Sequence, residues 1–221
     1  MHDAAMHSTV MYPGQVPRTA DPPVRTALIE QAAELLARRE PVTLRGLAEA
    51  VGVSTMAVYT HFGGMPGLWR AVRQEGFTRL AQRLGTVGGT EDPVRDLAAL
   101  GAAYVTNALS NPHLYRVMFD AVTDLEDPDA AAAPFQRLVD AAQRARRTGR
   151  FSAGAEPESV ATSLWAAGHG VTMLVLSGVL PETVLDTQGP ALAVAVLTAA
   201  GDDPQRCRDS VAAGWADVTG A

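Results

Sequence analysis

The stretch that decides the fold runs from Thr43 to Phe62 and reads TLRGLAEAVGVSTMAVYTHF. Apolar residues recur three and four positions apart on both sides of its centre, which predicts two short amphipathic helices. Gly52-Val53-Ser54 would join them, because glycine tolerates a left-handed turn, valine fills the space between the helices and serine can cap the second one. A helix-turn-helix has this geometry, and its second helix enters the DNA major groove. A simple corner between two helices uses the same glycine and cap, so the turn alone leaves both interpretations open.

The rest of the chain is also helical in pattern, and no stretch alternates apolar and polar residues with the period that strands require. Prolines and capping residues mark several helix starts, as at Asp21-Pro22-Pro23. We therefore expect an all-α fold, with an N-terminal three-helix domain that contains the helix-turn-helix and a larger C-terminal helical bundle. After the first three helices, the expected helices span residues 66–84, 93–110, 112–121, 130–147, 156–179, 189–200 and 204–218.

The N-terminal segment is rich in proline, which blocks helix formation, and it lacks the apolar centre of a secretory signal. We expect residues 1–22 to form a disordered arm, residues 23–66 to form the helix-turn-helix domain and residues 67–221 to form the second domain.

Charge is distributed unevenly along the 221 residues, whose net charge is −6. Residues 18–80 hold eight arginines against six acidic residues, whereas residues 81–221 hold ten against seventeen. The acidic excess therefore lies outside the helix-turn-helix and does not exclude DNA as a partner. The single cysteine, Cys207, excludes a disulfide within the chain and a cysteine-rich metal site, and it agrees with a reducing compartment.

From Val24 to Trp69 the sequence resembles the tetracycline-repressor (TetR) family of transcriptional regulators. The resemblance is carried by an amphipathic first helix and by four motifs: Thr43-Leu44-Arg45-Gly46-Leu47-Ala48, Gly52-Val53-Ser54, Val58-Tyr59-Thr60-His61-Phe62 and Leu68-Trp69. The Tyr-x-His-Phe ending is the diagnostic part. The resemblance implies a one-component regulator whose N-terminal domain binds double-stranded operator DNA. Its C-terminal domain would sense a small-molecule effector and dimerise.

The same resemblance implies a role in DNA binding for eight residues of the helix-turn-helix. Hydroxyl groups and a guanidinium can donate to phosphate oxygens, and a methionine can lie against base edges and thymine methyl groups. Each of these residues could also be a solvated surface residue. The implied contacts are Thr43, Arg45, Tyr59 and His61 to phosphates, Thr55, Met56 and Thr60 to bases, and Ser54 at the start of the reading helix.

One position departs from the family pattern. Where the family commonly has a lysine at the start of the fourth helix, this chain has Met65. The loss of one phosphate contact should weaken DNA binding and reduce its salt dependence by about one unit of slope. Arg18 and Arg25 could compensate by reaching phosphates or the minor groove.

Between Glu158 and Glu182 the chain carries no charge. The length would suffice for a membrane span, but glycines, hydroxyls and His169 interrupt the stretch and no basic cluster flanks it. A helix buried on both sides explains the pattern more simply, so we expect no membrane as a partner.

Two neighbouring stripes of this helix predict two roles. The first is small and smooth, which suits close packing on a symmetry mate: Leu164, Gly168, Val171, Val175 and Val179. The second carries aromatic, imidazole and hydroxyl groups, which suit the wall of a ligand pocket: Trp165, His169 and Thr172, with Met173 beside them. The segment Leu164–Gly170 also resembles the C-terminal domain class of TetR-like regulators that is named for its Trp-His-Gly motif.

Other helices of the bundle supply further candidate pocket residues, each of which could equally be core: Tyr104, Met118, Phe119 and Phe135. His169 could contact ligand or could be a core histidine bonded to a backbone carbonyl. Because few polar groups line the expected pocket, the effector should be a mostly hydrophobic small molecule. The five histidines are dispersed, so we expect no metal and no cofactor.

Together these features predict a cytoplasmic, homodimeric repressor that binds a palindromic operator with half-sites about 34–36 Å apart. The alternative is a helical ligand-binding or interaction protein with weakened DNA binding, which Met65 and the acidic total would favour. An enzyme built on His169 would lack a supporting acid, a nucleophile and a phosphate-binding loop.

Overall fold

The computed structural model describes residues 21–119 and 125–220, and within these ranges all regular structure is helical. The all-α prediction is therefore confirmed. All but the last two residues of the predicted arm lie outside the described ranges, and so does Arg18. The helices are α1 (Pro22–Ala37), α2 (Leu44–Val51), α3 (Thr55–Phe62), α4 (Met65–Gly85), α5 (Pro93–Ser110), α6 (Pro112–Met118), α7 (Pro128–Arg147), α8 (Pro157–Leu176), α9 (Val184–Ala199) and α10 (Pro204–Thr219).

Three predicted helix ends are wrong by three residues or more. The helix α6 ends at Met118 and not at residue 121. The helix α8 ends at Leu176 and not at Val179, because Gly178 adopts the left-handed conformation with φ 75°. The Val179 N–H then turns back to the Leu174 carbonyl at 2.9 Å and closes the helix. The helix α9 begins five residues earlier than predicted, and Pro190 lies inside it.

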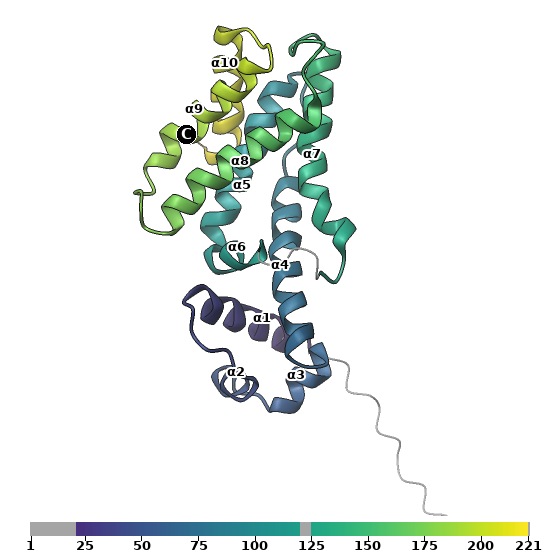
Figure 1. The fold of residues 1–221 in the computed structure, drawn as a ribbon, viewed down its shortest axis with the longest axis vertical. Helices are drawn as coiled ribbons and strands as arrows, with labels where there is room; N and C mark the ends of the chain where they lie inside the picture. The colour runs from purple at the N-terminus through teal and green to yellow at the C-terminus, as the bar shows by residue number, and fades with distance from the viewer. Residues whose placement is uncertain (1–20, 120–124, 221) are drawn as a thin grey trace, which may run out of the picture.

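The lower part of the molecule in Figure 1 is a small unit made of α1, α2, α3 and the first half of α4. The helices α2 and α3 have eight residues each, which is too short for a helix to be stable by itself in water. The helix α2 is therefore held by packing against α1 and α3, and α3 by packing against α1, α2 and α4. The buried residues that form this N-terminal core are Leu28, Ile29, Ala32, Ala33, Leu47, Val58, Leu68, Ala71, Val72, Leu114 and Val117.

The upper part of Figure 1 is a bundle in which α5 contacts α4, α7, α8, α9 and α10. Its buried residues form a second cluster, the bundle core, which includes Phe77, Leu80, Leu97, Leu100, Tyr104, Tyr115, Met118, Leu138, Leu164 and Leu197. The continuous helix α4 contributes to both cores, because Val72 belongs to the first and Phe77 to the second. The boundary predicted at residue 66 thus falls before the part of α4 that packs with α1–α3.

The short helix α6 also contributes to both cores. Leu114 and Val117 are buried in the N-terminal core, whereas Tyr115 and Met118 are buried in the bundle core. Residues three apart share a helix face, so two adjacent faces of α6 serve the two units. The approach of α6 to α4 is close, because a Cβ atom added at Gly76 would lie 2.6 Å from Met118 Cβ.

The apolar helix α8 is long and apolar enough to cross a membrane, judged by length and composition alone. It packs instead against α5, α7 and α9 of the bundle. Only 33% of its most apolar stretch is buried within the protomer, which leaves part of an apolar helix uncovered.

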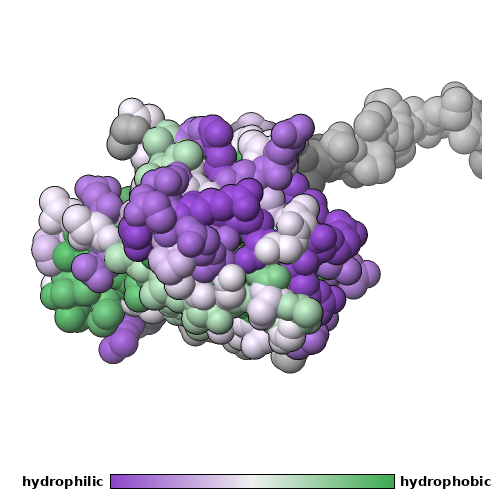
Figure 2. All heavy atoms as spheres, turned by 90° about the horizontal axis from the view of Figure 1, so that it is seen from above, coloured by the Kyte–Doolittle hydropathy of each residue, from purple (hydrophilic) through white to green (hydrophobic). Residues whose placement is uncertain are grey.

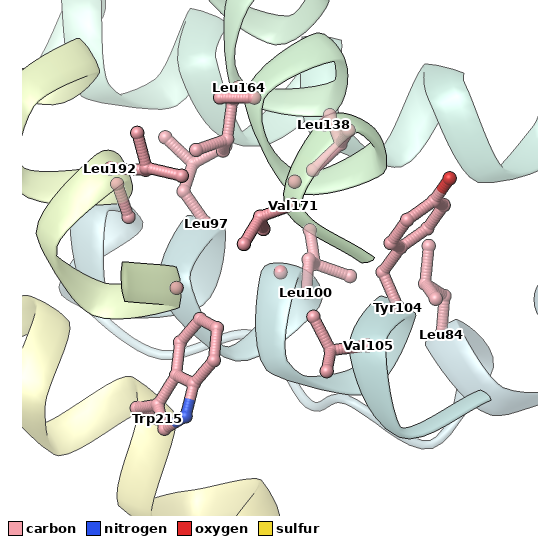
Figure 3. A pocket seen from close by; sticks show the side chains of 15 residues that line it. Leu84, Leu97, Leu100, Tyr104, Val105, Leu138, Leu164, Val171, Leu192 and Trp215 are labelled. Carbon is pink, nitrogen blue, oxygen red and sulfur yellow. The ribbon is translucent and has the colours of Figure 1, made fainter. Parts of the chain in front are cut away.

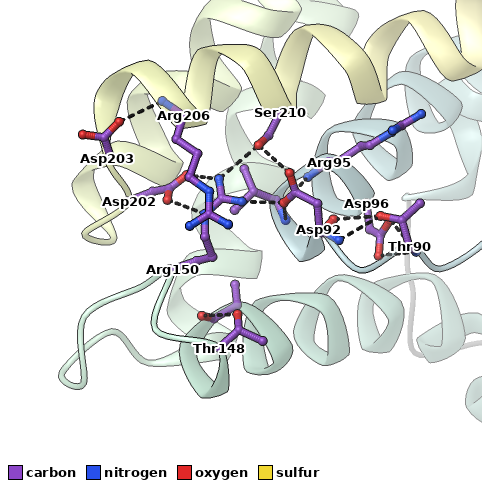
Figure 4. Close-up of polar contacts among 12 residues, drawn as sticks. Thr90, Asp92, Arg95, Asp96, Thr148, Arg150, Asp202, Asp203, Arg206 and Ser210 are labelled. Atoms are coloured by element: carbon purple, nitrogen blue, oxygen red, sulfur yellow. Dashed lines mark hydrogen bonds and ion pairs between the residues drawn. The ribbon is translucent and has the colours of Figure 1, made fainter.

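A buried polar network ties the start of α5 to the segments around α9 and α10 (Figure 4). Arg150 donates to both carboxylate oxygens of Asp202 at 2.7 Å and to Asp92 at 2.6 Å. Ser210 donates to the other oxygen of Asp92 at 2.6 Å. Arg150 and Asp202 are each only 4% exposed, so each charge has lost its contact with water and is stabilised by the opposite charge of its partner.

Replacing Arg150 with alanine should lower the free energy of unfolding by about 3–5 kcal/mol, because Asp202 would stay buried with an unpaired charge. Urea denaturation followed by circular dichroism measures the change. Arg95→Ala is the matched control, since it removes an Arg–Asp pair of similar two-bond geometry that is exposed to solvent. The control should leave the midpoint of the urea transition nearly unchanged. Equal shifts of this midpoint by the two substitutions would contradict the prediction.

Candidate DNA-binding face and ligand cavity

The turn between α2 and α3 has the conformation expected of a helix-turn-helix. Gly52 ends α2 in the left-handed conformation, with φ 74° and ψ 30°. The Thr43 hydroxyl accepts a hydrogen bond from the Gly46 N–H at 3.1 Å and so caps the start of α2. Ser54 stands at the capping position of α3, but its side chain makes no capping hydrogen bond. The capping role predicted for Ser54 is therefore wrong, and its exposed hydroxyl can serve another partner.

Most of the predicted DNA contacts lie on the surface. Met56 and Tyr59 are 66% and 54% exposed, and together with Thr60 they lie one turn apart on the same side of α3. Large hydrophobic side chains that stand out from a short helix mark a surface that another molecule can cover. The exposed members of the predicted set are Thr43, Arg45, Ser54, Thr55, Met56, Tyr59 and Thr60.

His61 is the exception, because it is half-buried. Its ring lies against Phe62 with 5.9 Å between the centroids, and its Nδ1 atom is buried without a hydrogen-bond partner among the described residues. A contact from His61 to a phosphate would therefore have to use Nε2.

Arg25 and Met65 bear on the phosphate contact that the sequence predicts to be lost. Met65 is half-buried and packs against the N-terminal core. The guanidinium of Arg25 lies over the Phe62 ring, 5.6 Å from its centroid, and pairs with Glu126 at 3.1 Å. In this structure Arg25 links α1 to the end of α3 and to the segment before α7. Compensation for Met65 by Arg25 stays a prediction, and it would require Arg25 to exchange its exposed pair with Glu126 for a phosphate.

The orientation of α3 is fixed by its crossing with α4. A Cβ atom at Gly67 would lie 1.8 Å from the Phe62 carbonyl oxygen, so only glycine allows the two helices to approach this closely. The turn between them uses Gly63 and Gly64, both with positive φ. The exposed side chains of α3 are therefore carried on a rigid corner.

The bundle encloses a narrow cavity of about 40 Å³ among α4, α5, α7, α8, α9 and α10 (Figure 3). A space of this size holds a few water molecules at most, so a larger ligand requires the helices to move apart. Trp215 forms one side, and a Cβ atom at Gly189 would lie 2.4 Å from its ring. The remaining lining is almost entirely apolar and includes Leu84, Leu97, Leu100, Tyr104, Val105, Leu138, Leu164, Val171 and Leu192.

Tyr104 is the one predicted ligand contact that lines this cavity. Aromatic rings of the others stack on one another: Phe119 lies 4.7 Å from His169, and Phe135 lies 5.3 Å from Trp165. Phe119, Phe135, Trp165 and His169 are half-buried, and their rings pack against one another beside the cavity. The predicted contacts that do not line the cavity are Met118, Phe119, Phe135, Trp165, His169, Thr172 and Met173.

Hydrogen bonds link α8, α5 and α6 beside the cavity. The Trp165 indole donates to the Tyr104 hydroxyl at 3.0 Å, and the Tyr104 and Tyr115 hydroxyls are 2.8 Å apart. His169 Nδ1 lies 2.8 Å from the Tyr115 hydroxyl and 3.0 Å from that of Tyr104. His169 is half-buried and bonded to tyrosine hydroxyls in place of a backbone carbonyl, and its contact with a ligand stays a prediction.

The protonation states of this network follow from burial. Burial raises the pKa of Tyr104 to about 12 and also raises the pKa of Tyr115, while it lowers the pKa of His169 below its ordinary value of 6.5. All three groups are therefore neutral near pH 7. One consistent arrangement has Tyr104 donating to Tyr115 and Tyr115 donating to His169 Nδ1.

The stripe of α8 predicted for dimerisation faces the inside of the protomer. Leu164 and Val171 are 7% and 8% exposed, and they line the cavity together with Gly168. Val175 packs in a small cluster between α5 and α9, and Val179 lies beyond the end of α8. Leu164 and Val171 are therefore covered within the chain itself, whereas Val179 is 65% exposed. Because α8 is apolar on every side, its sequence does not show which side meets a partner.

Another side of α8 is left exposed. A shallow groove separates it from α9, and small side chains line both walls. Figure 2 shows hydrophobic residues gathered at one side of the molecule, where α8 passes into α9 in Figure 1. The exposed residues of α8 on this side are Ser159, Ser163, Ala166, Gly170 and Leu174, and those of α9 include Ala195 and Ala199.

No group of three or more His, Cys, Asp or Glu side chains that could hold a metal ion is found in the described ranges. The two candidate sites are the exposed polar and aromatic face of α3 and the apolar cavity within the bundle.

Known proteins match both parts of the chain. A family profile described as a tetracyclin repressor-like C-terminal domain matches residues 97–199, which include the Leu164–Gly170 segment. A protein of Mycobacterium tuberculosis named as an uncharacterized HTH-type transcriptional regulator is 25% identical over 179 residues, which cover 80% of each protein.

Two solved structures share the fold. A bacterial regulatory protein of the TetR family from Rhodococcus RHA1 has a TM-score of 0.66 and 19% identity, with 81% of this chain and 98% of that chain covered. RolR in complex with the ligand resorcinol has a TM-score of 0.55 and 19% identity, with coverage of 86% and 93%. The fold and the matches define a helix-turn-helix transcriptional regulator with a helical C-terminal domain. Residues 97–199 thus match a tetracyclin repressor-like C-terminal domain, and over most of its length the chain is similar to an HTH-type regulator and to the fold of TetR-family proteins.

Proposed function

We propose that the chain is a homodimeric repressor that binds a palindromic operator and is released by a hydrophobic small molecule. The observation that carries DNA binding is the exposure of Met56 and Tyr59 on α3, a helix held rigidly by its crossing at Gly67. Such a surface fits a major groove, and two copies of α3 in a symmetric dimer would meet successive grooves about 34–36 Å apart. The repressor would act in the cytoplasm, where its operator lies.

The proposed dimer uses the exposed side of α8 and its groove with α9. Small side chains there let a second copy approach closely, and the apolar surface that the protomer leaves uncovered would be buried in the interface. A two-fold axis through this face makes the contact self-complementary.

The proposed effector occupies the cavity beside Tyr104. The lining supports an apolar ligand, because a polar group placed there would lose its hydrogen bonds to water. The relative RolR has been crystallised with resorcinol, which supports a small-molecule effector for this chain as well.

The proposed response follows from the size of the cavity. An effector the size of a drug-like molecule needs more room than this cavity offers, so its entry would displace α5 or α8, and Tyr104 and His169 on these helices hold Tyr115 of α6. The helix α6 packs on α1, so its movement would change how the N-terminal unit sits on the bundle. The ligand then favours a dimer with a different spacing of α3, and the operator is released.

The alternative function, a helical ligand-binding or interaction protein with weakened DNA binding, draws support from two residues. Met65 packs into the core where the family commonly has a lysine, and Arg25 is held by Glu126. The relatives named above are regulators and not enzymes. A mobility shift at low salt with the DNA that flanks the gene separates the two functions, since the alternative predicts no shift.

Ala166→Arg should convert the dimer to a monomer, because a guanidinium on the exposed side of α8 would be buried against its own symmetry mate. Analytical ultracentrifugation gives the mass, and a mobility shift should show operator affinity reduced at least tenfold. Ala212→Arg, at an exposed alanine of α10, is the matched control and should leave the dimer mass and the operator affinity unchanged. A variant with Arg at position 166 that remains a dimer would contradict the proposed interface.

Leu164→Trp should fill the cavity and abolish binding of an apolar ligand. The neutral fluorophore N-phenyl-1-naphthylamine serves as the probe, and its fluorescence rises when it enters an apolar site. Ala212→Trp adds the same ring to an exposed side of α10, away from the cavity and the proposed interface, and should bind the probe like the wild type. Equal probe binding by both variants would place the ligand site outside this cavity.

A further inference from the structure

The face of α3 lacks the side chains that read guanine, adenine and cytosine through paired hydrogen bonds. Arg or Lys makes such contacts to guanine, Asn or Gln to adenine, and Asp or Glu accepts from cytosine. The eight residues of α3 read TMAVYTHF and include none of these types. The one imidazole, that of His61, is half-buried with Nδ1 in the interior. Direct reading by this helix therefore cannot rest on paired hydrogen bonds.

Thr60 does not replace the missing donors. Its hydroxyl donates to the Met56 carbonyl oxygen at 2.9 Å, so its proton is used within the helix. The γ-methyl group and a lone pair of the oxygen remain for an outside partner. Met56 lies one turn away and adds a flexible thioether chain that is largely exposed. These two neighbouring side chains offer an apolar surface together with an acceptor.

We infer that α3 selects thymine by burying its C5-methyl group against Met56 and Thr60. Thymine is the base that places an apolar group in the major groove, so its methyl is the feature that such a surface can recognise. The inference rests on the proposed function and assigns the chemistry of the operator. Bases that face Met56 and Thr60 in each half-site are thymines, recognised by methyl contact. The α2 residues Thr43 and Arg45 hold phosphates and position α3 without reading sequence.

The test begins with an operator that the protein selects from a random duplex library. Each thymine of a half-site is then replaced singly by deoxyuridine, which removes the methyl group and keeps every hydrogen-bonding group. Fluorescence anisotropy should show that Kd rises about fourfold at each contacted thymine, the factor for one buried methyl group. In the variant Met56→Ala, the deoxyuridine replacement at the base that faces residue 56 should leave Kd nearly unchanged.

Arg45→Ala is the control. Loss of a phosphate contact should weaken binding to the thymine and the deoxyuridine operators equally, so the fourfold ratio of their Kd values should be kept. The inference is overturned if no deoxyuridine replacement alters Kd, or if Met56→Ala keeps the full sensitivity. Failure to enrich any sequence from the library would overturn the proposed operator binding itself, and with it this inference.

Discussion

The structure depends on the shared burial of one short helix, α6, between two hydrophobic cores. Leu114 and Val117 pack with α1, while Tyr115 and Met118 pack within the bundle. Because packed interiors resist small displacements, a shift of the bundle side of α6 must be felt on the α1 side. The hydrogen bonds from Tyr115 to Tyr104 and His169 then connect this helix to a wall of the cavity. The long helix α4 joins the two units covalently, but we propose that α6 makes the position of one depend on the state of the other.

Features that depend on local chemistry could be predicted from the sequence, and features that depend on distant packing could not. The helix-turn-helix is of the first kind, because Gly52, the Thr43 cap and the buried Val58 are all set within twenty residues. The faces of α8 are of the second kind. No charge marks a side of that helix, so the roles of its stripes depend on where α5 and α9 lie. The double role of α6 was also hidden, since seven residues are too few to show two stripes.

Charge and apolar surface are distributed in a way that suits two partners. Part of the acidic excess is used inside the bundle, where Asp92 and Asp202 meet Arg150 and Asp96 meets Arg144. Because residues 81–221 hold seventeen acidic residues against ten arginines, the net charge of −6 describes the bundle more than the surface of α3. Apolar groups remain exposed on α3 and on one side of α8, which are the two surfaces proposed to meet DNA and a second copy.

We propose that the Tyr115 hydroxyl couples the cavity to the DNA-binding unit, and operator affinity with and without a saturating apolar probe measures this coupling. The measurement compares the wild type with Tyr115→Phe, using N-phenyl-1-naphthylamine and fluorescence anisotropy of labelled operator. The probe should weaken operator binding at least tenfold in the wild type and by a much smaller factor in the variant. Both proteins should bind the probe alone, and the operator alone, with similar affinity. An equal loss of operator affinity in the two proteins would contradict the claim.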